Sequence, residues 1–336
     1  MSLILDGSNG ITFPNSSTQA VGFYGFKNRI INGGMVIDQR NSGASVTISS
    51  TAAVTYTLDR WGAYGTVGSK FSVQQNAGSI TPPAGFTNYL GTTSLASTSL
   101  GSSDYYAIQQ PIEGFNFADF GWGTANAKTV TLSAWVYSSL TGTFGGVLNN
   151  SAVNRSYPFS YSIPVANTWT QINITIAGDT TGTWIGATNG VGAYLRFSLG
   201  SGSTLSGTAG SWAGAAYVSA TGATSVVGTS GATFYITGVQ LEAGSTATSF
   251  DYRPYGTELA LCQRYYQSYI TQDLPANAVG TAVISALCLG ISMRVSPTAT
   301  WTNGFATGVS NVNYIDGYRT LSAAQYATNV TLSAEL

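Results

Sequence analysis

Few residues in this chain could support acid–base or nucleophilic chemistry. There is no histidine, which excludes Ser-His-Asp and Cys-His catalysis and metal sites built on imidazole. Three carboxylates, Asp104, Glu113 and Asp119, lie close together in the sequence, so a glycoside hydrolase that uses two carboxylates remains open. We favour the alternative that they are solvated loop or turn-capping acids, because sequence spacing does not fix the separation of two carboxyl groups. We therefore assign no catalytic residue and expect a protein that is not an enzyme.

Oxygen ligands for a structural calcium ion are present in predicted loops at Asp38, Asp179 and Asn189. They do not follow the spacing of an EF-hand loop, so calcium stays an open alternative, and no metal ligand or cofactor is assigned. Cys262 and Cys288 lie in different sequence contexts, and disulfide frameworks belong to small chains that cannot build a core. We predict that both thiols are buried and reduced.

Sugar binding needs aromatic faces that pack against pyranose C–H groups, with polar side chains nearby for the hydroxyls. Trp184, Trp212, Tyr217 and Arg155 lie in or beside predicted loops. We predict a shallow glycan site with Trp184 or Trp212 as its stacking platform and Arg155 or Tyr217 as its polar contact. The loop at 200–212 favours this hypothesis, because it is longer than strand pairing requires. The alternative is that each tryptophan plugs the end of a sandwich.

The amino-acid composition indicates which kind of fold positions these residues. Only 7% of the 336 residues are charged, whereas there are 41 glycines, 20 tyrosines, 14 phenylalanines and 7 tryptophans, which favours strands joined by turns. The formal charge is -1 and no basic run occurs, so nucleic acid is not an expected partner. Apolar stretches are too short for a membrane-spanning helix, and the first residues do not resemble a secretory signal. We expect a soluble protein made in the cytosol, without membrane insertion.

Residues 27–253 alternate short strand patterns with Gly, Ser, Thr and Asn loops. Between 130 and 137 the even-numbered residues are aliphatic, whereas the odd-numbered ones are Thr131, Ser133, Trp135 and Tyr137, so this strand has one aliphatic and one polar-aromatic face. The stretch 171–176 alternates in the same way. Many such strands with turns between them predict an all-β jelly-roll sandwich, with a closed barrel as the alternative.

Two smaller units flank the predicted sandwich. Residues 1–26 contain apolar pieces that cannot form a core alone, so we predict an attachment or trimerisation segment in which Ile4, Ile11 and Phe13 are covered by other copies or by a docking partner. Residues 254–336 begin with a predicted helix that has Thr257 as its N-cap and places Leu259, Cys262, Tyr266 and Tyr269 on one face. Strands are predicted at 283–295, 298–301, 312–315 and 326–332, which gives a small sheet covered by the helix.

Several of these segments resemble a known family, the tail-fibre and host-attachment proteins of tailed bacteriophages. The resemblance lies in LDGSNGITFPNSSTQ at 5–19, NRIINGGM at 28–35, LDRW at 58–61, ITGVQLEAG at 236–244, RPYGTEL at 253–259 and CQRYY at 262–266, together with Phe250. It covers nearly the whole chain. The matching segments look structural, with Arg60, Trp61, Tyr235 and Ile236 as core and sheet residues, so no ligand-binding residue is carried over.

The resemblance implies a virion component, usually homotrimeric, with a jelly-roll domain similar to carbohydrate-binding modules. The leading hypothesis is a tail fibre or adhesin that docks on other phage proteins through its N-terminus and contributes to attachment on a bacterial surface glycan. Two alternatives stay open. One is a capsid decoration or baseplate-peripheral protein without a ligand, and the other is a polysaccharide depolymerase, although depolymerases of phages tend to resemble parallel β-helices.

Overall fold

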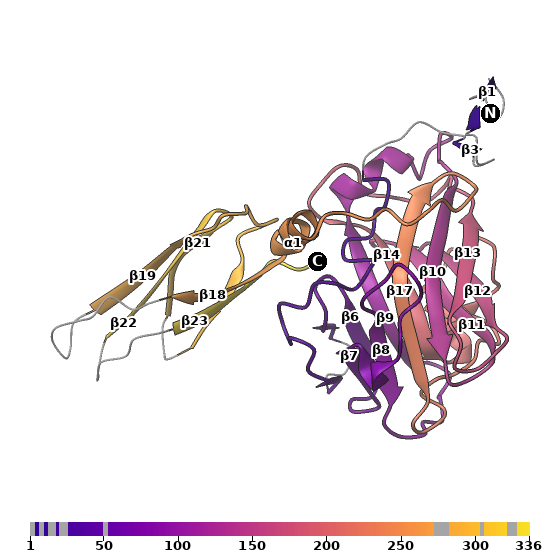
Figure 1. Cartoon of the computed structure of the whole chain (residues 1–336), viewed down its shortest axis with the longest axis horizontal. Helices are drawn as coiled ribbons and strands as arrows, with labels where there is room; N and C mark the ends of the chain where they lie inside the picture. Colours follow the sequence, from indigo (N-terminus) through magenta and orange to yellow (C-terminus); the bar gives the residue numbers. More distant parts are fainter. Residues whose placement is uncertain are drawn as a thin grey trace.

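The largest part of the molecule is a sandwich of two six-stranded sheets, on the right in Figure 1. The computed structural model describes residues 4–6, 10–12, 18–19, 26–49, 53–271, 282–302, 306–320 and 328–336. The first sheet, called here the β10 sheet, has the order β13 (Thr170–Ile176), β10 (Val130–Ser138), β17 (Thr233–Ala243), β8 (Leu90–Ser94), β7 (Phe71–Gln75) and β4 (Val46–Thr47). The second, the β14 sheet, has the order β12 (Ser156–Ile163), β11 (Gly142–Asn150), β14 (Val191–Ser201), β9 (Tyr105–Glu113), β6 (Gly62–Gly65) and β5 (Thr55–Tyr56).

The strand order confirms the prediction of a jelly-roll sandwich. Every pair within the two sheets is antiparallel. The chain alternates between the layers, with β8, β10 and β17 in one sheet and β9, β11 and β14 in the other. Short elements lie in the connections: η1 (Ala77–Ser79), η2 (Gly114–Asn116), η3 (Ala118–Phe120), η4 (Ser203–Leu205) and the parallel pair β15 (Ser206–Gly207) and β16 (Ser219–Ala220).

The core lies between the two sheets and follows from the alternation in the strands. Val130, Leu132 and Val136 point inward from β10 and are fully buried, as the aliphatic face of the sequence pattern predicts. Trp61 is completely buried and Arg60 is 1% exposed, which confirms both as core residues. A buried aliphatic or aromatic side chain of this kind contributes about 1.5–3 kcal/mol.

The N-terminal segment forms a small antiparallel sheet of β1 (Ile4–Asp6), β2 (Gly10–Thr12) and β3 (Thr18–Gln19). Ile4 lies in β1 opposite Thr12, and Ile11 lies in β2 opposite Leu5. Phe13 lies outside the described residues. Trimerisation by this segment stays a prediction.

The C-terminal part differs in detail from the sequence-based expectation. It has two three-stranded sheets, β18 (Tyr266–Thr271), β23 (Thr328–Ser333) and β20 (Thr298–Trp301) in one, and β19 (Ala282–Cys288), β22 (Tyr314–Thr320) and β21 (Ala306–Asn311) in the other. The strand at 298–301 is confirmed. The strand predicted at 283–295 ends at Cys288, and the strand predicted at 312–315 contains a turn, because β21 and β22 form a hairpin there. Tyr326 lies outside the described residues, and β23 begins at Thr328.

The helix α1 (Tyr255–Gln263) starts two residues before the predicted N-cap. Thr257 is not the cap, because the carbonyl of Pro254 already accepts the backbone N–H groups of Thr257 and Glu258. Tyr266 and Tyr269 do not share its face, since they belong to β18 and pair with β23. No helix in the described residues is long and apolar enough to cross a membrane.

The sequence predicts a helix that covers the small sheet. In the structure the helix instead lies between the small sheets and the sandwich (Figure 1). Its Cys262 packs with Ile31 and Ile37 of the sandwich. Burial raises the pKa of the Cys262 thiol well above its usual value, so it stays protonated. Cys288 is exposed, which corrects the prediction that both thiols are buried, because β19 lies in the small sheet. No disulfide joins the two cysteines.

Buried ion pairs fix the joint between the sandwich and the C-terminal part. Glu335 pairs with Arg40 at 2.7 Å and also with Arg60. Glu113 accepts two hydrogen bonds from Arg264, at 2.7 and 3.1 Å. The guanidinium of Arg60 lies 3.6 Å from the ring centre of Tyr265. Removing Glu335 would leave the buried Arg60 guanidinium without its carboxylate, and removing Arg264 would leave the buried Glu113 carboxylate without its cation.

A buried aspartate beside this joint makes stability depend on pH. Burial raises the pKa of Asp59 from 3.8 to about 6, although two hydrogen bonds from Gln39 oppose the shift. Because the folded-state pKa lies above the unfolded one, the group favours folding at acidic pH, and that contribution is lost as pH rises through about 6. The charged form then costs about 3 kcal/mol. We expect Asp59→Asn to remove this pH-dependent loss.

Urea unfolding at a series of pH values between 4 and 8 measures the free energy of unfolding of wild type and of Asp59→Asn. As pH rises to about 6, the free energy of unfolding of the variant should increase relative to that of wild type. The exposed Asp119→Asn serves as the control and should track wild type. A constant difference for Asp59→Asn would contradict the raised pKa.

Candidate functional site

The structure brings three of the four predicted sugar-binding residues together at one end of the sandwich. Trp184 and Trp212 meet edge to face with ring centres 5.6 Å apart, and the Arg155 guanidinium lies 5.8 Å from the Trp212 ring. Tyr217 is nearby, since its backbone N–H donates to the hydroxyl of Ser156. Its ring packs over Gly207.

These tryptophans are half-buried and their polar atoms are already used. Both pack against the core, in edge-to-face contact with Trp122 at 4.9 Å for Trp184 and 5.2 Å for Trp212. Trp184 donates its indole N–H to Asp179, and Trp212 donates to the carbonyl of Ala177. This geometry favours the alternative in which they plug the end of the sandwich. Their role in sugar binding stays a prediction.

Arg155 is likewise engaged within the protein. Its guanidinium donates two hydrogen bonds to Asp179, at 2.8 and 2.6 Å. Burial of Asp179 acts to raise its pKa, but hydrogen bonds from Arg155, Trp184 and Thr181 outweigh burial and lower the pKa below its usual value. The carboxylate is therefore charged and its oxygens are occupied by donors, which leaves little capacity for calcium.

The other acids also have separate partners. Asp104 accepts from Thr66 and Gly101, Glu113 pairs with Arg264, and Asp119 pairs with Arg29. Asp38 accepts the backbone N–H groups of Asn41 and Gly43, and Asn189 contacts Arg294. Within the described ranges, no group of three or more His, Cys, Asp or Glu side chains could hold a metal ion.

A different surface, the outer face of the β10 sheet, carries polar and aromatic side chains. In the register of the sheet, Trp135 of β10 lies between Gln171 of β13 and Thr237 of β17. In the next row, Tyr137 stacks on Tyr235 with ring centres 5.2 Å apart and an interplanar angle of 7°. Side chains opposite one another on paired strands share a face, so these rows form one continuous surface.

An irregularity in β17 shapes this face next to Trp135. The register between β10 and β17 shifts between Ser133 and Trp135, which is the mark of a β-bulge. Gly238 lies at the bulge with φ of +61°, a conformation that glycine adopts without strain. A Cβ there would lie 2.6 Å from the ring of Phe86, so the glycine lets Phe86 pack onto the sheet.

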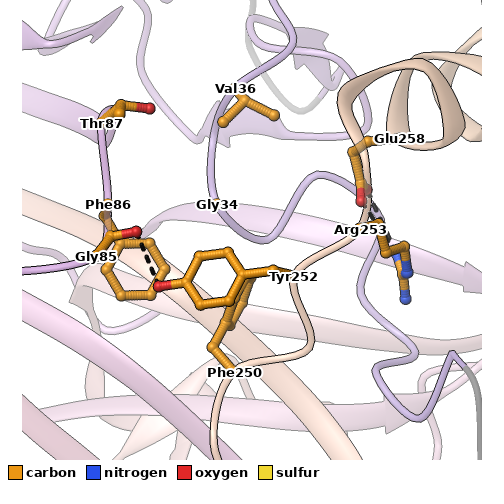
Figure 2. A pocket seen from close by; sticks show the side chains of 9 residues that line it. All are labelled: Gly34, Val36, Gly85, Phe86, Thr87, Phe250, Tyr252, Arg253 and Glu258. Carbon is orange, nitrogen blue, oxygen red and sulfur yellow. Dashed lines mark hydrogen bonds and ion pairs between the residues drawn. The ribbon is translucent and has the colours of Figure 1, made fainter.

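Trp135 lines a pocket on this face with a volume of about 240 Å³. The pocket is lined by Ala84, Phe86, Ser133, Ala134, Trp135, Gln171, Gly238, Thr248, Ser249, Phe250 and Tyr252, all of them uncharged. We call it the Trp135 groove. One side of it is formed by the rings of Phe86, Phe250 and Tyr252, which lie 4.9 to 5.6 Å apart and are called here the three-ring wall (Figure 2).

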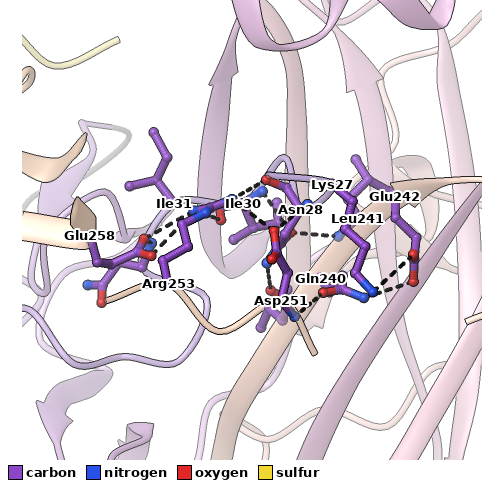
Figure 3. Close-up of polar contacts among 12 residues, drawn as sticks. Lys27, Asn28, Ile30, Ile31, Gln240, Leu241, Glu242, Asp251, Arg253 and Glu258 are labelled. Carbon is purple, nitrogen blue, oxygen red and sulfur yellow. Dashed lines mark hydrogen bonds and ion pairs between the residues drawn. The ribbon is translucent and has the colours of Figure 1, made fainter. Parts of the chain in front are cut away.

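Buried polar residues of β17 hold the loop that carries two rings of this wall, Phe250 and Tyr252 (Figure 3). Gln240 accepts the backbone N–H of Asp251, and Glu242 accepts the backbone N–H and hydroxyl of Thr248. Arg253 follows the wall in sequence and donates to the carbonyl groups of Asn28 and Ile30. The loop is thus fixed both to the sheet and to residues 28–30, the extended segment that enters the sandwich.

Trp135 is distinguished by its indole N–H. The indole N–H groups of Trp61, Trp122, Trp169, Trp184, Trp212 and Trp301 all donate hydrogen bonds. Among the described residues, the N–H of Trp135 has no partner, and its ring pairs with no other aromatic ring. Because buried tryptophans normally satisfy this donor within the protein, Trp135 is the one available to a ligand.

Sequence reasoning missed this site, although its signal was present. The alternation in 130–137 had already placed Trp135 and Tyr137 on a polar-aromatic face. Loop tryptophans attract the prediction instead, because binding residues are often found on loops. Aromatic residues on the outer face of a strand, where polar residues alone are usual, are the signal that indicates a binding surface there.

Comparisons with known proteins return solved structures only. No family model matches the sequence, and no curated protein matches it. One similar structure is the enzymatically active domain of tailspike protein 4 of bacteriophage CBA120, at 12% identity and a TM-score of 0.32 over 65% of this chain. The match spans 22% of that tailspike chain.

Two further similar structures are carbohydrate-binding modules. The N-terminal cellulose-binding domain of β-1,4-glucanase C from Cellulomonas fimi matches at 16% identity, with a TM-score of 0.30 over 56% of this chain and 90% of the domain. The family 11 carbohydrate-binding module of a cellulosomal cellulase of Clostridium thermocellum matches at 10% identity, with a TM-score of 0.28 over 61% of this chain and 98% of the module.

Proposed function

We propose that this protein is a non-catalytic tail-fibre adhesin of a tailed bacteriophage that binds a bacterial surface glycan in the Trp135 groove. The observation that carries the proposal is the free indole N–H of Trp135 in a groove lined by uncharged side chains. An indole face packs against the C–H groups of a pyranose, while Gln171 and Ser133 offer hydrogen bonds to its hydroxyls. The resemblance of several sequence segments to phage tail-fibre proteins supports the place of this activity in a virion.

Single sites of this kind are expected to be weak. Dissociation constants between millimolar and micromolar correspond to about 4 to 8 kcal/mol of binding free energy. Several copies on one fibre raise the avidity, because the second contact is made at a high effective concentration. A weak site is therefore compatible with firm attachment of the whole particle.

The direct test is adsorption of the purified protein to host cells and to their isolated surface polysaccharide. Trp135→Ala should reduce binding at least about tenfold, because stacking and the indole hydrogen bond are both lost. Trp135→Phe should retain part of the binding, since it keeps an aromatic face. Unchanged binding in Trp135→Ala would contradict the proposal, and release of new reducing ends from the polysaccharide would favour a depolymerase instead.

The multivalency of the fibre gives a separate prediction. We expect the full chain to be a homotrimer organised by residues 1–26, since apolar residues such as Ile4 and Ile11 need copies of themselves to cover them. Light scattering should show that a chain beginning at Lys27 has a weakened or lost trimer. A full-length protein that is monomeric at micromolar concentration would contradict this prediction.

A further inference from the structure

A second pocket lies beyond the three-ring wall and differs in chemistry from the Trp135 groove. Its volume is about 230 Å³, and it is lined by Gly34, Val36, Gly85, Phe86, Thr87, Phe250, Tyr252, Arg253 and Glu258. The three rings of the wall line both pockets, so the two are neighbours on one surface. Figure 2 shows Val36 across the pocket from Tyr252, with Arg253 and Glu258 at its far end.

Most polar groups of this second pocket are already engaged. The Tyr252 hydroxyl donates to the carbonyl of Gly85 at 2.8 Å. Arg253 and Glu258 pair with each other, and Glu258 also accepts the backbone N–H of Asn32. A sugar hydroxyl placed here would lose its hydrogen bonds to water and find few partners in the pocket, which is unfavourable. An apolar group would instead gain contacts with the rings and with Val36.

We infer that this second pocket receives a methyl group carried by the bound glycan, either the acetamido methyl of an N-acetylated hexosamine or the C6 methyl of a 6-deoxyhexose. The inference rests on the proposed function, because it places the adjoining sugar on Trp135. Each pocket alone is smaller than the roughly 300–1,000 Å³ usual for ligand sites, so a ligand that spans both pockets fits better than one confined to either.

Gly34 allows the second pocket to be filled from a position that does not itself line the Trp135 groove. A Cβ added at Gly34 would lie 3.8 Å from the ring of Phe250 and 3.9 Å from Val36, which are ordinary van der Waals contacts. Gly34→Leu should therefore fold and occupy the pocket. Gly290→Leu is the matched control, because a Cβ at Gly290 in the C-terminal part has no atom within 4 Å.

The experiment titrates the full chain with two matched pairs of sugars by calorimetry or NMR. Chitotetraose and cellotetraose differ by an acetamido group in place of a hydroxyl, and L-rhamnose and L-mannose differ only by the oxygen on C6. We expect the methyl-bearing member of one pair to bind about tenfold more tightly than its partner. The pair that shows the preference identifies which methyl the pocket receives. Gly34→Leu should abolish the preference but keep the weaker binding, and Gly290→Leu should behave as wild type.

Equal affinity within both pairs, or a preference that survives Gly34→Leu, would overturn the inference. A changed oligomeric state in Gly34→Leu without a changed preference would also overturn it, by indicating that another subunit fills the pocket. The Trp135→Ala variant separates this failure from failure of the proposed function. If Trp135→Ala loses binding while no preference exists, only the methyl pocket is wrong. If no probe binds at millimolar concentration, or if Trp135→Ala binds as wild type does, the proposed function fails as well.

Discussion

Replacing Arg253 with alanine is expected to lower the free energy of unfolding by about 3–5 kcal/mol. The Arg253 side chain is 5% exposed and joins the carbonyl groups of Asn28 and Ile30 to the carboxylate of Glu258. Its removal leaves Glu258 as a buried charge without its cation. Three segments then lose their common partner: residues 28–30, the loop that carries Phe250 and Tyr252, and the first turn of α1.

Urea unfolding followed by circular dichroism measures this effect, with Arg29→Ala as the control. Arg29 pairs with the exposed Asp119 at 2.6 Å, and surface pairs of this kind contribute about 0–1 kcal/mol. Equal losses for the two variants would show that Arg253 does not hold these segments together.

Replacing Trp184 with alanine is expected to cost about 3 kcal/mol of stability. Its ring stacks on Phe117 at 5.6 Å with an interplanar angle of 17°, and its N–H donates to Asp179 at 3.1 Å. Truncation leaves a cavity among packed rings and removes one donor from a buried carboxylate. Trp135→Ala should cost about 1 kcal/mol or less, because its ring packs against no other aromatic ring in the described part of the chain.

Chemical unfolding of both variants, again followed by circular dichroism, compares the two tryptophans directly. Trp184→Phe should recover much of the loss, because it restores the ring but not the hydrogen bond. A stable Trp184→Ala that fails to bind glycan would favour the originally predicted loop site over the Trp135 groove.

The sandwich could be predicted from the sequence because strand alternation is a local property. Val130, Leu132 and Val136 on one face of a nine-residue strand require a layer to cover them, whatever the rest of the chain does. The C-terminal strands were predicted less well, because their ends depend on pairing. The pattern at 283–295 continues past Cys288, but the partner strand β22 begins opposite that residue at Tyr314.

The alternation at 130–137 predicts that Trp135 lies on the outer face of its strand, but it does not predict that Trp135 stays uncovered, because this depends on which loops cover which tryptophan. Trp184 and Trp212 lie in Gly-rich connections, but these connections fold back onto the sandwich, where Trp212 donates to Ala177, 35 residues earlier. Trp135 lies in the middle of a strand, and its exposure depends on where the loops that carry Phe86 and Tyr252 end. Such contacts join segments 35 or more residues apart, which no local pattern encodes.

NMR of the indole N–H groups tests the central claim most directly, because each of the seven tryptophans gives one resonance and only Trp135 has a free donor within the described structure. Variants that each lack one tryptophan assign the resonances. On titration with glycan fragments from the host surface, the Trp135 resonance should shift in a saturable manner, while those of Trp184 and Trp212 stay in place. Saturable shifts of Trp184 or Trp212 with an unmoved Trp135 resonance would contradict the Trp135 groove as the binding site.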